Sequence, residues 1–228
     1  MHRFVRMALC LVICVSTSAL VGLAWPLSRS DEIISGELIP LASWQKKFQI
    51  TAGKDRGQVV PIIFHHDPVN EQRWKLTFGN YGSILMRSDS SGTLMMERLD
   101  LFKSRSYIVY EPALPILPGD IMPAAATPHL AGFKMYDVET GKLKRTGQAT
   151  HLVKQILPSQ FDTPAGLIDG FYVDIEHGMN MPFAHLDFRL RLGCRLDDGP
   201  VYGSGQYTLK KLGLFSETKT AAAALDRR

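Results

Sequence analysis

Alternating hydrophobic and polar residues dominate the readable part of this chain. Every second side chain is apolar in residues 74–78 and again in residues 186–196, and most of the residues between them are charged. A period of two predicts strands that bury one face, and clusters such as Asp197-Asp198-Gly199-Pro200 predict the turns between them. We therefore predict an all-β, mostly antiparallel fold, either a curved half-barrel or a barrel-like sandwich. Helix is scarce, and only parts of residues 41–50 favour a short one.

The spacing of strands and turns predicts specific neighbours in the sheet. Three successive strands form a meander, a fourth follows it, and the second half contains two hairpins and a last strand. The predicted strands are residues 73–78, 83–87, 93–102, 106–110, 133–138, 142–157, 171–177, 186–196 and 201–212, with 171–177 paired to 186–196.

Two segments do not fit the strand pattern. Residues 111–130 contain five prolines, which are poorly tolerated in helices and central strands, so we expect a long extended loop. Residues 216–228 are polar or alanine-rich, and we expect a disordered tail. The remainder, residues 25–215, is predicted to form a single β-rich domain.

The first 24 residues have the features of an export segment. Arg3 and Arg6 precede an apolar run from Met7 to Trp25 that is interrupted by small residues. This pattern predicts a secretory signal, cut after Ala19 or Ala24, or an uncleaved membrane anchor. Both alternatives place the domain in the periplasm, either free or anchored in the inner membrane and facing the periplasm.

Charge and cysteine content narrow the classes of function. Removal of residues 1–24 takes away two arginines and no acid, which lowers the net charge from +4 to +2. Lysine and arginine are not clustered, so we expect no nucleic-acid partner. Cys194 is the one cysteine of the predicted domain. It therefore forms no intrachain disulfide, and we expect it to be a small buried hydrophobic residue.

One histidine and two methionines form the sharpest candidate for a metal site. His177, Met179 and Met181 fall on one face of an extended strand, and imidazole with thioether ligands suits copper(I). That face also carries apolar residues, so methionines that fill the core are the plainer interpretation. His185 is predicted to lie on the opposite, polar face. No other cofactor is expected.

Two carboxylates are the weaker candidate for chemistry. Asp174 and Glu176 share the outer face of the same strand, at a separation of about 7 Å. Such a pair suits acid–base hydrolysis, but an ordinary solvated strand face is a far commoner reason for it. No residue is assigned a catalytic role.

Two stretches carry a resemblance to a known group of proteins. They are Tyr107–Pro118, a strand that enters a proline-rich segment, and Phe161–Gly166, a Thr-Pro-Ala-Gly turn that leads into the strand Tyr172–Glu176. Together, within residues 100–177, they resemble uncharacterised bacterial periplasmic β-proteins. The resemblance implies the half-open barrel of Lol-type lipoprotein carriers, with an apolar concave face and no catalytic residues.

These observations favour a non-enzymatic envelope protein that binds an apolar or lipid-like ligand, or a partner protein. A membrane contact is expected only through the N-terminal segment, if it stays uncleaved. The alternatives are copper handling through His177, Met179 and Met181, and hydrolysis by Asp174 and Glu176 or by a histidine. The plain alternative to a ligand site is a sandwich with a filled core and no cavity.

Overall fold

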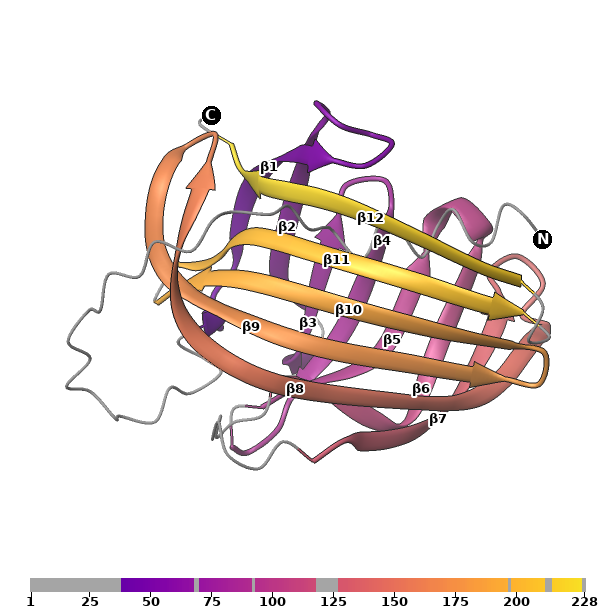
Figure 1. Cartoon of the computed structure of the whole chain (residues 1–228). Coiled ribbons are helices and arrows are strands. Elements are labelled where there is room, and N and C mark those ends of the chain that lie inside the picture. The colour runs from indigo at the N-terminus through magenta and orange to yellow at the C-terminus, as the bar shows by residue number, and fades with distance from the viewer. Residues whose placement is uncertain are drawn as a thin grey trace.

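The structure, a computed structural model, describes residues 38–67, 70–91, 93–117, 127–196, 198–211 and 215–226. Within these residues twelve strands form a closed antiparallel barrel, which confirms the all-β prediction (Figure 1). A single 3-10 turn, η1 (Phe102–Ser104), interrupts them. The strands are β1 (Trp44–Ala52), β2 (Val59–Asp67), β3 (Asn70–Phe78), β4 (Gly82–Ser88), β5 (Leu94–Leu101), β6 (Ser106–Leu117), β7 (His129–Asp137), β8 (Leu143–Thr163), β9 (Gly166–Met181), β10 (Ala184–Arg195), β11 (Gly199–Lys211) and β12 (Phe215–Leu225).

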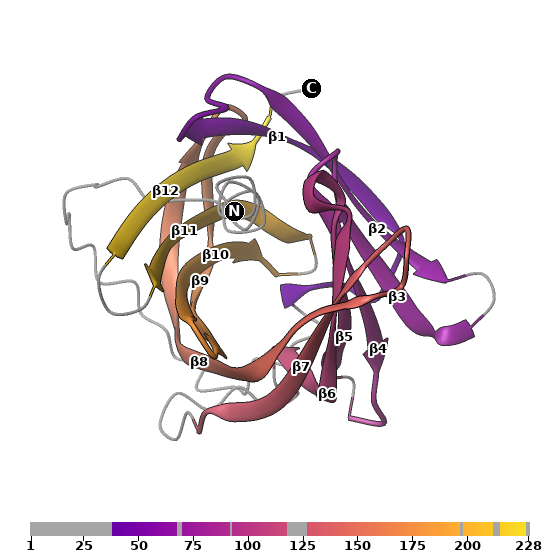
Figure 2. The ribbon, with the colours of Figure 1, turned by 90° about the vertical axis from the view of Figure 1, so that its right-hand side faces the viewer.

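Each strand pairs with its neighbours in the chain, and β12 pairs with β1 to close the sheet. The predicted meander and hairpins are confirmed, including the pairing of β9 with β10 through Phe171–Cys194 and His177–Phe188. The long strands β8–β12 form one wall of the barrel (Figures 1 and 2). Strands β2–β7 form the opposite wall, and their direction makes a steep angle with that of β8–β12. The sheet is therefore closed and is not the half-open barrel that the resemblance implies.

The predicted short helix in residues 41–50 is wrong. Residues from Trp44 onward form β1, which pairs with β2 on one side and with β12 on the other. Phe48 and Ile50 alternate with polar residues and are buried. This two-residue period suits a strand, and pairing on both sides satisfies its backbone groups.

The predicted proline-rich loop is also partly wrong, because β6 continues through Pro112 and Pro115 to Leu117. Its pairing with β7 ends at Glu111, whereas its pairing with β5 continues to Leu117. The prolines therefore lie where one side of the strand needs no ladder hydrogen bond, the position in which a sheet accepts them. Residues 118–126, like the expected export segment 1–24, lie outside the described residues.

The predicted disordered tail is in fact a barrel strand. β12 pairs with β11 along its length and with β1 near Leu225. Residues 221–224 are four buried alanines, so the strand is covered on both faces and shows no polar alternation. Opposite residues 221–223, β11 presents Gly205, Ser204 and Gly203. Small residues on both strands allow close packing of this seam.

Two groups of side chains divide the interior of the barrel along its length. In one half, the stacked rings of Trp44, Phe64 and Trp74, with centroids 5.4 and 4.8 Å apart, belong to a cluster that fills the interior. In the other half, a second cluster that includes Phe133, Met179 and Phe188 lines the wall. The first half is a packed plug, and the second half surrounds the candidate site.

Candidate functional site

The candidate site is an apolar cavity of about 400 Å³ inside the second half of the barrel. It reaches the β9–β10 turn, where Phe183 and Phe215 line it and are 68% and 70% exposed. We call this end the mouth, and Figure 2 views the barrel from it. Most of the lining side chains are aliphatic, aromatic or methionine. The polar or charged ones are Tyr110, His151 and His177 within the cavity and Arg145 and Lys211.

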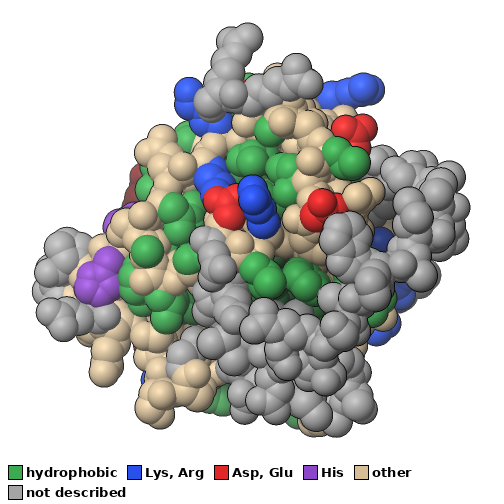
Figure 3. All heavy atoms as spheres, turned by 90° about the vertical axis from the view of Figure 1, so that its left-hand side faces the viewer, with side chains coloured by type: hydrophobic (Ala, Val, Ile, Leu, Met, Phe, Trp, Pro, Cys, Tyr) green, Lys and Arg blue, Asp and Glu red, His purple; other side chains and the backbone are tan. Residues whose placement is uncertain are grey.

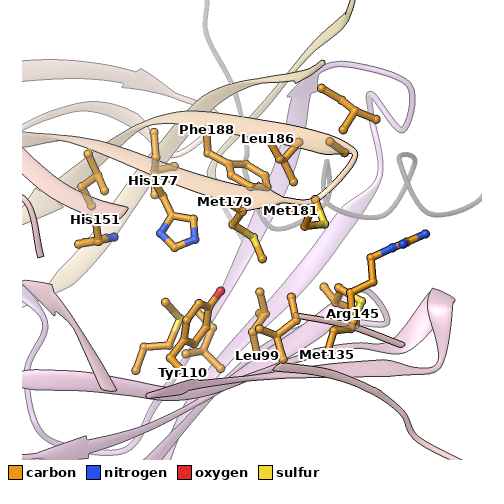
Figure 4. A pocket seen from close by; sticks show the side chains of 18 of the residues that line it. Leu99, Tyr110, Met135, Arg145, His151, His177, Met179, Met181, Leu186 and Phe188 are labelled. Carbon is orange, nitrogen blue, oxygen red and sulfur yellow. The ribbon is translucent and has the colours of Figure 1, made fainter. Parts of the chain in front are cut away.

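Strand alternation explains why the wall is apolar. Along β9, Ile175, His177, Met179 and Met181 all line the cavity, because residues two apart point to the same side of a strand. The structure thus brings together His177, Met179 and Met181, as the sequence predicts (Figure 4). Copper binding by them stays a prediction. Among the described residues, no three histidine, cysteine, aspartate or glutamate side chains cluster as a metal site would require.

His185 lies outside the cavity, on the polar face that the sequence predicts. Its imidazole contacts the Asp187 carboxylate at 2.5 Å and the Asn180 side chain. It therefore takes no part in a site with His177.

Sequence reasoning missed two polar residues of the cavity, Tyr110 from β6 and His151 from β8. His151 lies directly opposite His177 in the β8–β9 ladder, and their ring centroids are 5.6 Å apart. The Tyr110 ring lies 5.9 Å from the His177 ring, almost perpendicular to it. We call Tyr110, His151 and His177 the polar trio. The signal that could have found His151 is its place between Ala149 and Val153 in an alternating run.

Tyr110 and His151 of the polar trio are buried, His177 is half-buried, and all three are incompletely hydrogen-bonded. Tyr110 is 3% exposed and His151 is 5% exposed. Within the described part of the chain, no partner contacts the Tyr110 hydroxyl or the Nδ1 atoms of His151 and His177. Buried polar atoms are normally paired, and each unpaired one costs free energy, on the order of 1–3 kcal/mol. Three such atoms around one cavity are therefore unusual.

Burial also fixes the charge state of the polar trio. It lowers the pKa of His151 to about 4, although a hydrogen bond to the Ile116 carbonyl opposes the shift. Burial and the neighbouring His151 lower the pKa of His177 to about 3. Burial raises the pKa of Tyr110 well above its ordinary value. All three side chains are therefore neutral at pH 7.

One hydrogen bond determines which nitrogen of His151 carries the proton. His151 Nε2 lies 3.2 Å from the carbonyl oxygen of Ile116. A carbonyl only accepts, so Nε2 is the N–H donor and the unpaired Nδ1 of the neutral ring is an acceptor. The polar trio thus presents at least one hydroxyl donor and one nitrogen acceptor.

Two cations line the cavity near the mouth. Lys211 is the β11 partner of Ala184 at the β9–β10 turn, and Arg145 lies near the start of β8. Figure 4 shows Arg145 on the Met181 side of the cavity, away from His151 and His177. Neither cation forms an ion pair within the described residues, whereas thirteen ion pairs involve other side chains.

The candidate carboxylates lie on the outer face, along an open polar groove. Asp174 pairs with Arg191 at 2.8 Å, and Glu176 pairs with Lys154 at 3.1 Å. Partial burial alone would raise the pKa of Asp174, but hydrogen bonds from Arg191 and Gln155 hold it below its ordinary value. A carboxyl group with a lowered pKa stays ionised and is a poor proton donor at neutral pH.

Cys194 is fully buried, as predicted. Burial raises the pKa of its thiol to about 12. The thiol is therefore protonated at neutral pH and packs as a small apolar group in the plug, on the far side of the interior from the mouth.

The end of the barrel opposite the mouth has a mixed surface. In Figure 3, which views this end, lysine or arginine side chains adjoin acidic ones between hydrophobic groups.

The described residues contain no helix long and apolar enough to cross a membrane.

Comparison with known proteins finds two solved structures that match this chain in part. The hypothetical lipoprotein YmcC from Escherichia coli is 7% identical, with a TM-score of 0.39, over 76% of this chain and 89% of its own. A protein from Parabacteroides distasonis described as a candidate lipoprotein is 11% identical, with a TM-score of 0.33, over 81% of this chain and 92% of its own. No family model and no curated protein matches the sequence. The site described above therefore rests on this chain alone.

Proposed function

We propose that this protein is an exported envelope protein that binds, without catalysis, the apolar chain of a lipid-like molecule inside its barrel. The cavity of about 400 Å³ carries the proposal. Its volume lies within the roughly 300–1,000 Å³ of ligand pockets, and its wall is apolar with few polar groups, as in such pockets. The N-terminal pattern, Arg3 and Arg6 before an apolar run, supports a location in the periplasm or at the inner membrane.

The cations near the mouth support an amphiphile with a negative group as the ligand. Arg145 and Lys211 lack acidic partners among the described residues and line the same cavity as the apolar wall. An acyl chain inside the barrel with its anionic end at the mouth would satisfy both features, because only the uncharged part of the molecule leaves water.

Blocking the cavity tests this proposal. The purified domain, taken here and below as residues 25–228 so that β12 is included, should bind dodecanoate and the neutral dye N-phenyl-1-naphthylamine, and each should displace the other. Leu186→Trp places a larger ring in the wall of the cavity, and Met181→Trp does so nearer the mouth. Both variants should lose binding by at least about tenfold. Leu143→Trp, at a residue that is exposed and outside the cavity, should not. Equal binding by folded blocked variants, or no binding by the wild type, would refute the proposal.

Copper(I) binding is a second candidate, favoured by the shared position of His177, Met179 and Met181 on one wall of the cavity. Titration of the domain with copper(I) against a competing chelator tests it. Replacing both methionines with leucine should then weaken binding at least tenfold. Unchanged binding by that variant would exclude these thioethers as ligands.

A further inference from the structure

The unpaired groups of the polar trio are complementary to one kind of ligand group. The Tyr110 hydroxyl donates, and His151 Nδ1 accepts because its Nε2 proton is used by the Ile116 carbonyl. A group that both accepts and donates, such as a hydroxyl, satisfies both partners at once. An ether or ester oxygen satisfies only the donor, since it has no proton for His151.

The surroundings exclude a charged group at this depth. The polar trio is neutral, and the residues around it in the cavity are apolar. A carboxylate or phosphate there would lose its hydration without gaining a cation, which is costly in an apolar environment. The cations that line the cavity, Arg145 and Lys211, lie nearer the mouth, where β8 begins and β11 ends.

The depth of the polar trio is set by β9. His177 lies four residues along the strand from Met181, which adjoins the mouth, a distance of about 13 Å at the rise of an extended strand. The Tyr110 hydroxyl points across the cavity toward His177 (Figure 4). A chain that enters from the mouth therefore passes Met181 and Met179 before its inner part reaches the polar trio.

We propose that the barrel selects a single-chain anionic amphiphile whose chain carries a neutral hydroxyl group, held between Tyr110 and His151 beside His177. This inference rests on the proposed binding of a lipid-like chain and adds the chemistry that distinguishes one chain from another. The anionic end lies at Arg145 and Lys211, and the hydroxyl replaces the hydrogen bonds that the polar trio otherwise lacks.

Three probes that differ only at the far end of the chain test the inference. They are dodecanoate, ω-hydroxydodecanoate and ω-methoxydodecanoate, measured by calorimetry at pH 7.5 on the purified domain. The hydroxy acid should bind about fivefold tighter than the methoxy acid, because it alone donates to His151 and a hydrogen bond contributes on the order of 1 kcal/mol. Dodecanoate measures the contribution of the apolar chain and the carboxylate without the hydroxyl group.

Tyr110→Phe removes only the hydroxyl donor. It should weaken ω-hydroxydodecanoate about fivefold and leave dodecanoate within about twofold of the wild type. Tyr136→Phe is the matched control, because Tyr136 stacks on Tyr107 and does not line the cavity. It should change neither affinity.

The outcomes separate the two proposals. If dodecanoate and both derivatives fail to bind, the lipid-binding function itself is wrong. If dodecanoate binds but the hydroxy and methoxy acids bind equally, or Tyr110→Phe leaves the hydroxy acid unaffected, the polar trio holds water only and the inference is overturned while the function stands.

Discussion

Acidification should destabilise this protein well above the pH at which carboxylates titrate, because two neutral histidines, the buried His151 and the half-buried His177, line its cavity. The pKa of His151 is about 4 and that of His177 about 3 in the folded state, against 6.5 for an ordinary imidazole. As the pH falls through 6.5, His151 and His177 become protonated in the unfolded chain but stay neutral in the folded barrel. The unfolding free energy is therefore unaffected by these histidines above pH 6.5, and it decreases as the pH falls from 6.5 toward their folded-state pKa values.

The expected magnitude follows from these values. At pH 5, protonation stabilises an imidazole of pKa 6.5 in the unfolded chain by about 2 kcal/mol. Folded His151 and His177 gain almost nothing at that pH, since their pKa values lie lower. The pair should therefore cost about 4 kcal/mol of unfolding free energy between pH 7.5 and pH 5, out of the roughly 5–15 kcal/mol typical of a domain.

Urea unfolding of the purified domain at pH 7.5 and pH 5 measures this loss. The carboxyls of Asp89 and Asp174 have pKa values below the ordinary 3.8. The stability that they contribute is therefore fully present above pH 3.8 and does not change between pH 7.5 and pH 5. His151→Gln keeps an N–H for the Ile116 carbonyl, and His177→Gln removes the second imidazole. Each variant should reduce the pH-dependent loss by about 2 kcal/mol, whatever its absolute stability.

His65→Gln is the control, because His65 lies on the outer face of β2, next in sequence to the buried Phe64. Its loss between the two pH values should match that of the wild type. A double variant of His151 and His177 that loses as much stability as the wild type would refute the argument, as would an NMR titration showing either ring ionising near pH 6.5 in the folded protein.

Three further changes test the fold. Deletion of residues 215–228 removes β12 and leaves β1 and β11 as open edges, so cooperative thermal unfolding by circular dichroism should disappear; deletion of 227–228 alone should preserve it. Gly147→Ala adds a Cβ that would overlap the backbone oxygen of Asn180 and lie 2.7 Å from the Phe133 ring; urea unfolding should show a loss of about 1–3 kcal/mol, and a neutral result would contradict this close packing. Phe64→Ala empties the centre of the stacked plug and should cost about 3–5 kcal/mol in the same assay; a loss below about 1 kcal/mol would show that the plug is not tightly packed.

Much of the fold could be predicted because strand alternation is a local property. The period of two along β9 and β10 determines which side chains share a face before any pairing is known. The positions of His177, Met179 and Met181 on one wall, and of His185 on the other face, follow directly. The positions of the turns could be predicted as well, because glycine, proline and aspartate favour turns through their own backbone and side-chain geometry.

The segments whose structure differs from their local sequence pattern depend on partners far away in the sequence. The alanines of residues 221–224 form a strand because β11 and β1 supply both ladders and cover both faces. Pro112 and Pro115 are accepted because β7 leaves β6 at Glu111. The local sequence of a segment shows neither fact, because the backbone N–H and C=O groups of a strand are hydrogen-bonded by another strand.

The sequence by itself determined the all-β class, the faces of the strands and the apolar character of the inward side. Tertiary structure decided that the sheet closes, that a plug fills one half, and that a cavity remains in the other. It also brought Tyr110, from β6, to His151 and His177, which face each other through the β8–β9 register. That meeting depends on register and on the curvature of the whole barrel, which are set by all twelve strands together and not by any one segment.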